Sequence, residues 1–307
     1  MSSRRLAKAA VTDSRDPTAK TILGNIAALR TGYDWAAEGR EFNRASICEL
    51  HETLFHGTRD DHLGGVVRER QSWLGGDASS PANAEFIPPA PEHVPELLDD
   101  LAEFCNRDDI PAVLQAAIAH AQFETIHPFM DGNGRIGRAL IGMIMIKRGV
   151  AQLAVPPVSL VLGANADLYV RGLTSYRHSG ADDWFALFSD VVATAARAAS
   201  QLAESISELQ SDWLDQADNP RRGSAPRKLI EAIPAHPVLT LAHANELTGL
   251  SDEASRQALN RLEAAGVIRE TTAGKRNRVW ESVGLFALMD EFERAIGDRS
   301  KTPSETN

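Results

Sequence analysis

Apolar residues recur at intervals of three and four along most of the chain, the spacing that places them on one face of a helix. The segments that show it are residues 18–36, 42–57, 94–106, 111–126, 138–149 and 182–210. One stretch alternates apolar and polar residues, 267–282, and predicts a pair of strands. The pattern therefore predicts a mainly α fold.

Two polar stretches interrupt the helical pattern. Residues 75–95 are rich in Pro, Gly, Ser and Asn and predict a β-hairpin or a long loop. Residues 215–227 change composition sharply and predict a domain boundary. We expect an N-terminal helical segment (1–42), a main domain (43–200), a helix and linker (201–225), a small domain (226–290) and a polar tail (291–307).

The small domain is expected to run as three helices and a hairpin, which resembles a winged helix-turn-helix. Thr240 and Ser251 have the residue type of helix N-caps, and Gly249 that of a helix end. DNA contact through residues 251–278 would use Arg256, Gln257, Asn260, Arg261, Arg269, Lys275, Arg276 and Arg278. The acids Asp252, Glu253 and Glu263 dilute that charge, so protein docking or dimerisation is the alternative.

The composition argues against a chain that coats nucleic acid or membrane through bulk charge, because the formal net charge is −10. Cys48 and Cys105 lie in apolar helical contexts without C-x-x-C spacing, so we expect reduced, buried thiols. No stretch reaches the roughly 18 apolar residues of a membrane span, and no apolar core follows the N-terminal arginines. We expect a cytoplasmic protein without membrane contact.

Residues that carry chemistry gather in one stretch, IHPFMDGNGRIGRALIGMI, residues 126–144. Gly132, Gly134 and Gly137 satisfy the pattern G-x-G-x-x-G, but a dinucleotide-binding turn needs a preceding strand and a later acidic residue at about 20 positions. A helical pattern precedes these glycines, and no acid stands at the required distance. A Walker A loop lacks its G-K-[ST], and an EF-hand would have Arg135 at a ligand position.

The same stretch suits a metal-bound polyphosphate. His127 precedes Pro128, which disfavours the α region for His127 and ends the first helix. The glycines let main-chain amides turn inward at the start of a second helix, expected near Arg135, where anions bind. Arg135 and Arg138 would oppose the helix dipole unless an anion lay between them. Asp131 has the chemistry of a magnesium ligand, and His127 that of a general base.

The segment HPFMDGNGRIGR, residues 127–138, resembles the signature of the Fic family, H-P-F-x-[DE]-G-N-G-R-x-x-R, at every fixed position. The preceding segments VVRERQSWLGG and NAEFIPPAPEHVPELLDDL are also similar to Fic proteins. The resemblance covers roughly residues 20–200. It implies a Fic-type helical bundle with a small β-hairpin flap, to which the winged helix domain is added.

The resemblance implies a protein adenylyltransferase, which moves AMP from ATP, with Mg²⁺, to a Ser, Thr or Tyr hydroxyl of a target protein and releases pyrophosphate. His127 would be the catalytic base and Asp131 the metal ligand. Asn133 would bind the α-phosphate, and the two arginines the β- and γ-phosphates. The nucleotide-binding residues would be Gly132, Asn133, Gly134, Arg135, Gly137 and Arg138. Family members that phosphorylate instead carry lysine at the place of Gly134.

Two further expectations rest on the resemblance. Residues 75–91 resemble the flap, which pairs with an extended segment of the target protein and orients its hydroxyl; a passive surface loop is the alternative. Tyr169 is expected to line the adenine pocket, with a core tyrosine as the alternative. The target protein, the type of residue modified and the oligomeric state, including a homodimer, stay open.

Many Fic proteins carry an inhibitory motif, [ST]-x-x-x-E-[GN], which no segment of this chain matches. The nearest is SQLAES, residues 200–205. Either the inhibitory motif is absent, or the start of the chain is truncated, or a partner chain supplies the motif. We expect the purified chain to adenylylate itself. The alternatives are a DNA-binding regulator or toxin-antitoxin component that uses the fold as a nucleotide sensor, and a transferase with another donor, UTP or a choline-bearing nucleotide.

Overall fold

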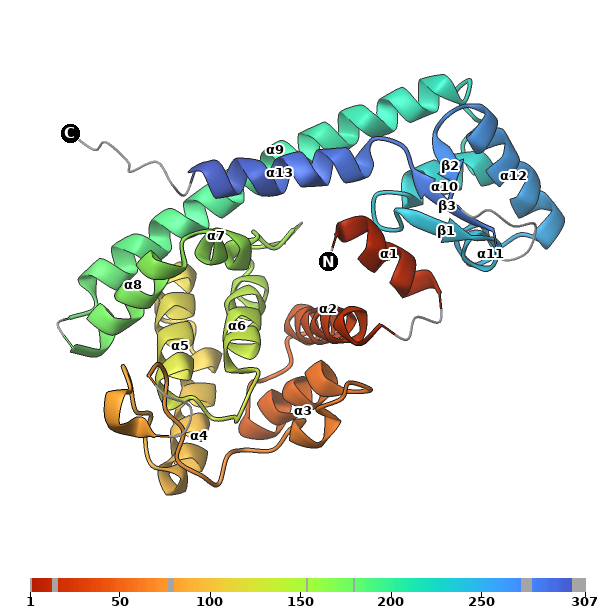
Figure 1. Cartoon of the computed structure of the whole chain (residues 1–307). Coiled ribbons are helices and arrows are strands. Elements are labelled where there is room, and N and C mark those ends of the chain that lie inside the picture. Colours follow the sequence, from red (N-terminus) through yellow and green to blue (C-terminus); the bar gives the residue numbers. More distant parts are fainter. Residues whose placement is uncertain are drawn as a thin grey trace, which may run out of the picture. The chain divides into compact units, whose positions relative to one another are not determined.

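The chain is mainly helical and divides into two compact units (Figure 1). A computed structural model describes residues 2–12, 16–76, 80–152, 154–178, 180–271 and 278–299. The first unit consists of residues 20–196, and the second joins residues 1–19 to residues 197–307. Among the described residues, none of the helices combines the length and the low charge that crossing a membrane requires.

The first unit is a bundle of helices. Its elements are α2 (Pro17–Ala37), α3 (Arg44–Phe55), α4 (Val94–Asn106), α5 (Ala112–Ile126), α6 (Asn133–Lys147), α7 (Val158–Ala164), α8 (Ala166–His178), the first part of α9 (Asp182–Gln216), and the 3-10 turns η1 (Asp61–Leu63), η2 (Pro81–Asn83) and η3 (Pro91–His93). The helices predicted from apolar spacing are confirmed. The periodicity missed α7 and α8, and α7 has only seven residues.

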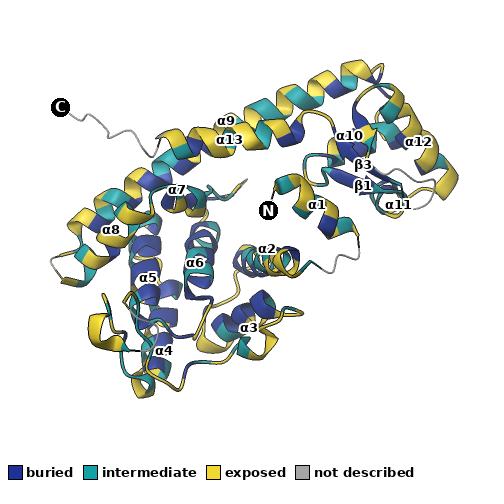
Figure 2. Cartoon of the chain, in the orientation of Figure 1, coloured by how far each residue is buried: buried dark blue, intermediate teal, exposed yellow. Residues whose placement is uncertain are grey.

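Helix α5 forms the centre of this bundle, in contact with α4, α6 and α8. It is apolar on nearly every side, as expected for a helix surrounded by others. Its buried residues include a series of alanines, which let the neighbouring helices approach closely. Figure 2 shows α5 buried along most of its length. The C-terminal end of α5 and the N-terminal end of α6 frame the loop 127–132.

The hairpin expected in residues 75–95 is reduced to a single antiparallel bridge between Leu74 and Phe86. Leu74 donates its N–H to the Phe86 carbonyl at 2.9 Å, and Glu85 donates to the Leu74 carbonyl at 2.8 Å. The prolines at 81, 88 and 89 lack the N–H that a longer ladder needs, which limits the pairing. Residues 77–79 lie outside the described part of the chain.

The second unit combines helices with a three-stranded antiparallel sheet of order β1-β3-β2. Its elements are α1 (Ser3–Val11), the end of α9, α10 (Ala225–Ala232), β1 (Val238–Thr240), α11 (Leu241–Thr248), α12 (Asp252–Ala264), β2 (Ile268–Glu270), β3 (Val279–Ser282) and α13 (Leu285–Arg299). The predicted strand pair is confirmed, with Ile268 opposite Ser282. Its turn, residues 272–277, lies outside the described residues. Trp213 of α9 and Trp280 of β3 are buried in the core of this unit.

Two segments near the chain ends differ from the prediction. Helix α13 continues to Arg299, so much of the expected tail 291–307 is helical, and Ile296 within it is buried. Helix α1 packs on β1 and α13 of the second unit. The local sequence of α1 indicates a helix, but it contains no signal for that distant partner.

Candidate active site

His127 is the residue at which α5 stops. Its N–H closes the last turn on the Phe123 carbonyl at 2.9 Å. The following Pro128 keeps His127 out of the right-handed helical region, as predicted, and the residue takes the left-handed conformation with φ 49° and ψ 62°. Such a backbone is uncommon outside glycine and gathers at functional sites. Burial, and next the charge of Arg68, lowers the pKa of the imidazole to about 4, so His127 is neutral at physiological pH.

The loop after His127 is fixed by a second histidine, His51 of α3. Its Nδ1 accepts from the Gly65 N–H at 3.0 Å, so its Nε2 carries the hydrogen and donates to the Asp131 carbonyl at 2.9 Å. The ring also stacks on Phe129, with centroids 3.7 Å apart. Gly132 has φ 83°, and a Cβ there would lie 2.9 Å from Nε2 of His51. Both the backbone conformation and the close approach therefore require glycine at this position.

Asn133 closes the loop from inside. Its Oδ1 accepts from the Phe129 N–H at 2.9 Å, and its Nδ2 donates to the Phe129 carbonyl at 2.7 Å. The residue is 2 % exposed. A contact with the α-phosphate would therefore have to use the second hydrogen of Nδ2, and the contacts present give Asn133 a role in shaping the loop.

The carboxylate of Asp131 lies at the surface of the loop, with a side chain that is 60 % exposed. Its Oδ1 accepts from the Gly132 N–H at 2.6 Å, and its Oδ2 accepts from Arg135 at 2.9 Å. The guanidinium of Arg135 also lies over the Phe55 ring, 4.9 Å from its centroid. The structure thus places a carboxylate and a cation of the signature side by side.

The first turn of α6 offers main-chain donors next to these charges. The helix begins at Asn133, two residues before the expected start. Arg135 and Ile136 both donate to the Gly132 carbonyl at 3.1 Å. The N–H groups of Asn133 and Gly134 have no partner among the residues that the structure describes. A Cβ on Gly134 would lie 2.8 Å from Nη1 of Arg138, so that guanidinium lies beside the open amides, an arrangement suited to an anion.

Gly137 faces α5. A Cβ there would lie 2.7 Å from Oε1 of Glu124, 3.1 Å from Nδ1 of His120 and 3.1 Å from the Phe123 ring. The glycine therefore lets α5 and α6 approach closely, and its contact with a nucleotide stays a prediction. Burial raises the pKa of Glu124 to about 7, and burial lowers the pKa of His120 to about 4.

Tyr169 of α8 lies near His120 and Glu124. Its hydroxyl and Nε2 of His120 are 2.9 Å apart. Burial, and next the charge of Glu124, raises the pKa of the phenol, whereas the nearby charge of Arg138 lowers it. The structure therefore brings Tyr169 close to the second signature arginine, and the residue is only partly buried.

Two arginines that the sequence did not single out support the site. Arg68 is 2 % exposed and donates to the carbonyls of His127 (2.8 Å), Pro89 (2.6 Å), Arg70 (3.2 Å) and Ile126 (3.3 Å). Arg177 of α8 contacts the last turn of α5 from another direction. Pro128 could have signalled a donor such as Arg177, because a proline leaves the carbonyl four residues earlier, that of Glu124, without its usual donor.

The described side chains expected to contact DNA are mostly paired with acids, carbonyls or each other. Their contacts are Arg256 with Glu253 (2.9 Å), Gln257 with Glu253 (3.0 Å), Arg261 with the Ala217 carbonyl (2.6 Å), Arg278 with Glu263 (3.0 Å) and Glu270 (2.7 Å), Arg278 with Asn260 (3.5 Å), and Arg269 with Glu281. Lys275 and Arg276 lie outside the described residues. These pairings reduce the positive charge that this surface offers to phosphates.

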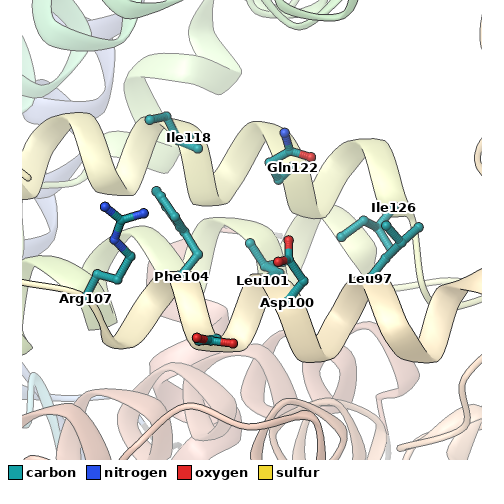
Figure 3. A pocket seen from close by; sticks show the side chains of 9 residues that line it. Leu97, Asp100, Leu101, Phe104, Arg107, Ile118, Gln122 and Ile126 are labelled. Atoms are coloured by element: carbon teal, nitrogen blue, oxygen red, sulfur yellow. The ribbon is translucent and has the colours of Figure 1, made fainter.

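A hollow of about 290 Å³ lies between α4 and α5. Figure 3 shows Phe104 and Leu101 where the two helices face each other and Ile118 on α5, with Arg107 near one end and Leu97 and Ile126 near the other. The lining contains none of the residues from His127 to Arg138. Cys48 and Cys105 are both free thiols, as predicted, but only Cys105 is buried, whereas Cys48 is partly exposed.

Comparison with known proteins relates the site to a family. Residues 41–145 match the model of the Fic/DOC family. Protein adenylyltransferase fic-1 of Caenorhabditis briggsae is 34% identical over 153 residues, which are 48% of this chain and 27% of the relative. A probable protein adenylyltransferase of Aquifex aeolicus is 42% identical over 72 residues, 23% of this chain and 22% of the relative. The chain thus spans about a quarter of the length of these relatives.

The crystal structure of a Fic family protein from Desulfovibrio desulfuricans G20 has a similar fold. It superimposes with a TM-score of 0.51 at 22% identity and covers 88% of this chain and 77% of that one. The chain therefore has a mainly helical Fic-type fold with a small three-stranded antiparallel sheet near its C-terminus.

Proposed function

Because residues 41–145 match the model of the Fic/DOC family and are similar to Fic adenylyltransferases, we propose that the protein transfers AMP from ATP to a Ser, Thr or Tyr hydroxyl of a protein. One observation carries the proposal. A neutral imidazole at the end of α5 shares a loop with an anion site made of the open Asn133 and Gly134 amides, Arg135 and Arg138. The imidazole can take a proton from the acceptor, and the amides and arginines can position the phosphates and offset their charge, as phosphoryl-type transfer requires.

His127 acts as the base. It takes the proton of the acceptor hydroxyl while the hydroxyl oxygen attacks the α-phosphorus, and the bond from that phosphorus to the bridging oxygen breaks to release pyrophosphate. The imidazole is ready for this step because its pKa of about 4 leaves it unprotonated at neutral pH. The amides and arginines of α6 orient the phosphates and offset their charge.

Asp131 fits a magnesium site. It is an exposed carboxylate, and magnesium in phosphate sites takes one or two protein carboxylates while it keeps several waters. Magnesium would supply charge neutralisation between neighbouring phosphates. For this, Oδ2 of Asp131 would exchange Arg135 for the metal, which releases the guanidinium toward the phosphates.

The two other expected contacts join this proposal. Residues 75–91 serve as the flap on which an extended acceptor segment docks, supported by the Leu74–Phe86 bridge. Tyr169 forms part of the wall of the nucleotide site, supported by its place beside Arg138. We also assign residues 225–282 to a winged helix domain on its order of elements and strands. The cations described in this domain are largely paired, which favours protein docking or dimerisation, and its contact with DNA stays a prediction.

The test is transfer of label from ATP that carries radioactive phosphorus at the α-position. The wild-type chain should label itself or proteins of a lysate in the presence of magnesium, and His127→Ala should lose this label while it still binds ATP. His56→Ala is the matched control, an exposed histidine that should label like the wild type. Label transfer by His127→Ala at the wild-type rate would overturn the proposal, as would a wild-type chain that labels no protein with ATP. Label from UTP or CTP without label from ATP would show a transferase with another donor.

A further inference from the structure

Arg177 of α8 joins three parts of the first unit that are distant in sequence. Its Nη2 donates to the Glu124 carbonyl at 3.2 Å, and its Nε donates to Oγ1 of Thr125 at 3.2 Å, both in the last turn of α5. Its guanidinium lies over the ring of Phe86 in the flap, residues 75–91, with Cζ 3.9 Å from the centroid. One side chain therefore contacts both the flap and the helix end that carries His127.

The contact with Glu124 replaces a bond that the sequence removes. In an α-helix this carbonyl would accept from residue 128, but Pro128 has no N–H. Arg177 supplies a donor in its place, and a cation at a helix C-terminus also opposes the negative end of the dipole. Arg68 donates to the next free carbonyls, those of Ile126 and His127. The turn before His127 is thus held by side chains from outside the helix.

The flap is attached to the same two arginines. Arg68 binds the Pro89 carbonyl at the base of the flap, and Arg177 stacks on Phe86 beside the bridge to Leu74. Gln71 adds a hydrogen bond to the Pro88 carbonyl at 2.8 Å. Arg68 is buried, whereas Arg177 is only partly buried and lies where the flap and α5 meet. A planar guanidinium suits this place, since it can stack and donate at once.

We propose that Arg177 is a positioning residue: it fastens the flap to the end of α5 and so fixes where an acceptor hydroxyl lies relative to His127. This inference rests on the proposed function. Arg177 acts through Phe86 and the α5 carbonyl, and the open amides, Arg135 and Arg138 hold the phosphates without it. Loss of Arg177 therefore impairs transfer to a protein hydroxyl and leaves the affinity for ATP unchanged.

The first measurement is hydrogen exchange of the flap amides, which needs no substrate. In Arg177→Ala the amides of Leu74, Glu85 and Phe86 should exchange about tenfold faster, because their bridge loses its support. Phe86→Ala should have a similar effect, and the double variant should be no worse than either single one, as expected when two residues act through one contact. Arg171→Ala, on an exposed residue of the same helix, is the control and should exchange like the wild type.

The second measurement separates the acceptor from the nucleotide. The probe acceptor is a copy of this chain with His127→Ala, labelled in trans from radioactive ATP, and ATP affinity is measured by calorimetry. Arg177→Ala should lower transfer about tenfold or more with an ATP affinity within about twofold of wild type. Arg177→Lys should restore only part of the lost transfer, because the single ammonium of lysine cannot lie flat on the Phe86 ring and donate from two nitrogens at once.

The outcomes are separable. Unchanged flap exchange in Arg177→Ala, or exchange effects of Arg177→Ala and Phe86→Ala that simply add, would overturn the positioning role. Equal loss of ATP affinity and of transfer would also overturn it, by making Arg177 a nucleotide ligand. A wild-type chain that transfers no label, with flap exchange altered as expected, would contradict the proposed function and leave the mechanical link between Arg177, the flap and α5 standing.

Discussion

At the scale of single residues, the preparation of His127 comes from its surroundings. The residue is partly buried at a helix end, and the neighbouring cations Arg68 and Arg177 both disfavour a proton on its ring. Burial is the largest cause, since it penalises the charged form of the imidazole. The same environment pushes Glu124 in the opposite direction, because the charged form of a carboxyl is the deprotonated one. His127 is therefore unprotonated at neutral pH, whereas Glu124 is only partly ionised there.

This environment predicts the pH dependence of transfer. A base works only when it is unprotonated, and the pKa of His127 is about 4 instead of the ordinary 6.5, so kcat/KM should stay level as the pH falls from 8 to about 5 and decline below that. The measurement is label transfer over this range, with circular dichroism at each pH to exclude acid unfolding. An acid limb centred near pH 6.5 in folded protein would contradict the burial of the imidazole.

At the scale of elements, the sequence predicted α5 and α6 because their apolar spacing is local information. It also predicted the break between them, since Pro128 acts on its own neighbour. It could not predict what holds the loop in shape. His51 on α3 and Arg68 after η1 reach the loop from positions more than 50 residues earlier, and only the folded bundle brings them there. The chemical roles of the signature residues could therefore be predicted from the sequence, whereas the side chains that hold the loop could not.

Asn133 shows the same division, because the resemblance implied a phosphate ligand whereas the hydrogen bonds of its side chain hold the loop. Asn133→Ala would leave the buried N–H and carbonyl of Phe129 without partners, and we expect it to lower the free energy of unfolding by about 2–4 kcal/mol. Urea denaturation of the nucleotide-free chain is the measurement. If the variant kept the wild-type free energy of unfolding and lost only affinity for ATP, Asn133 would be a phosphate ligand instead of a loop brace.

At the scale of the whole molecule, the second unit is assembled from both ends of the chain. Helix α1 carries Arg4, which pairs with Glu281 of β3 at 3.1 Å, and Arg269 of β2 pairs with the other oxygen of the same carboxylate. The Glu281 side chain is 4 % exposed, while both arginines are more than half exposed. A prediction from local pattern could place α1 and β3, but no local pattern relates residues that are almost 280 positions apart.

This triad makes a testable prediction about the coupling between α1 and the sheet. Arg4→Ala or Arg269→Ala alone leaves Glu281 one partner, so each should cost about 1 kcal/mol or less, as for exposed ion pairs. The double variant leaves a buried carboxylate without a cation and should cost about 3–5 kcal/mol, more than the sum of the two. Hydrogen exchange of the β3 amides reports on the unit directly. Arg5→Ala, on the same helix as Arg4, removes the pair of Arg5 with Asp16 and no contact of Glu281, so it should leave β3 unchanged. Strict additivity of the Arg4 and Arg269 variants would show that α1 lies on the sheet without stabilising its buried charge.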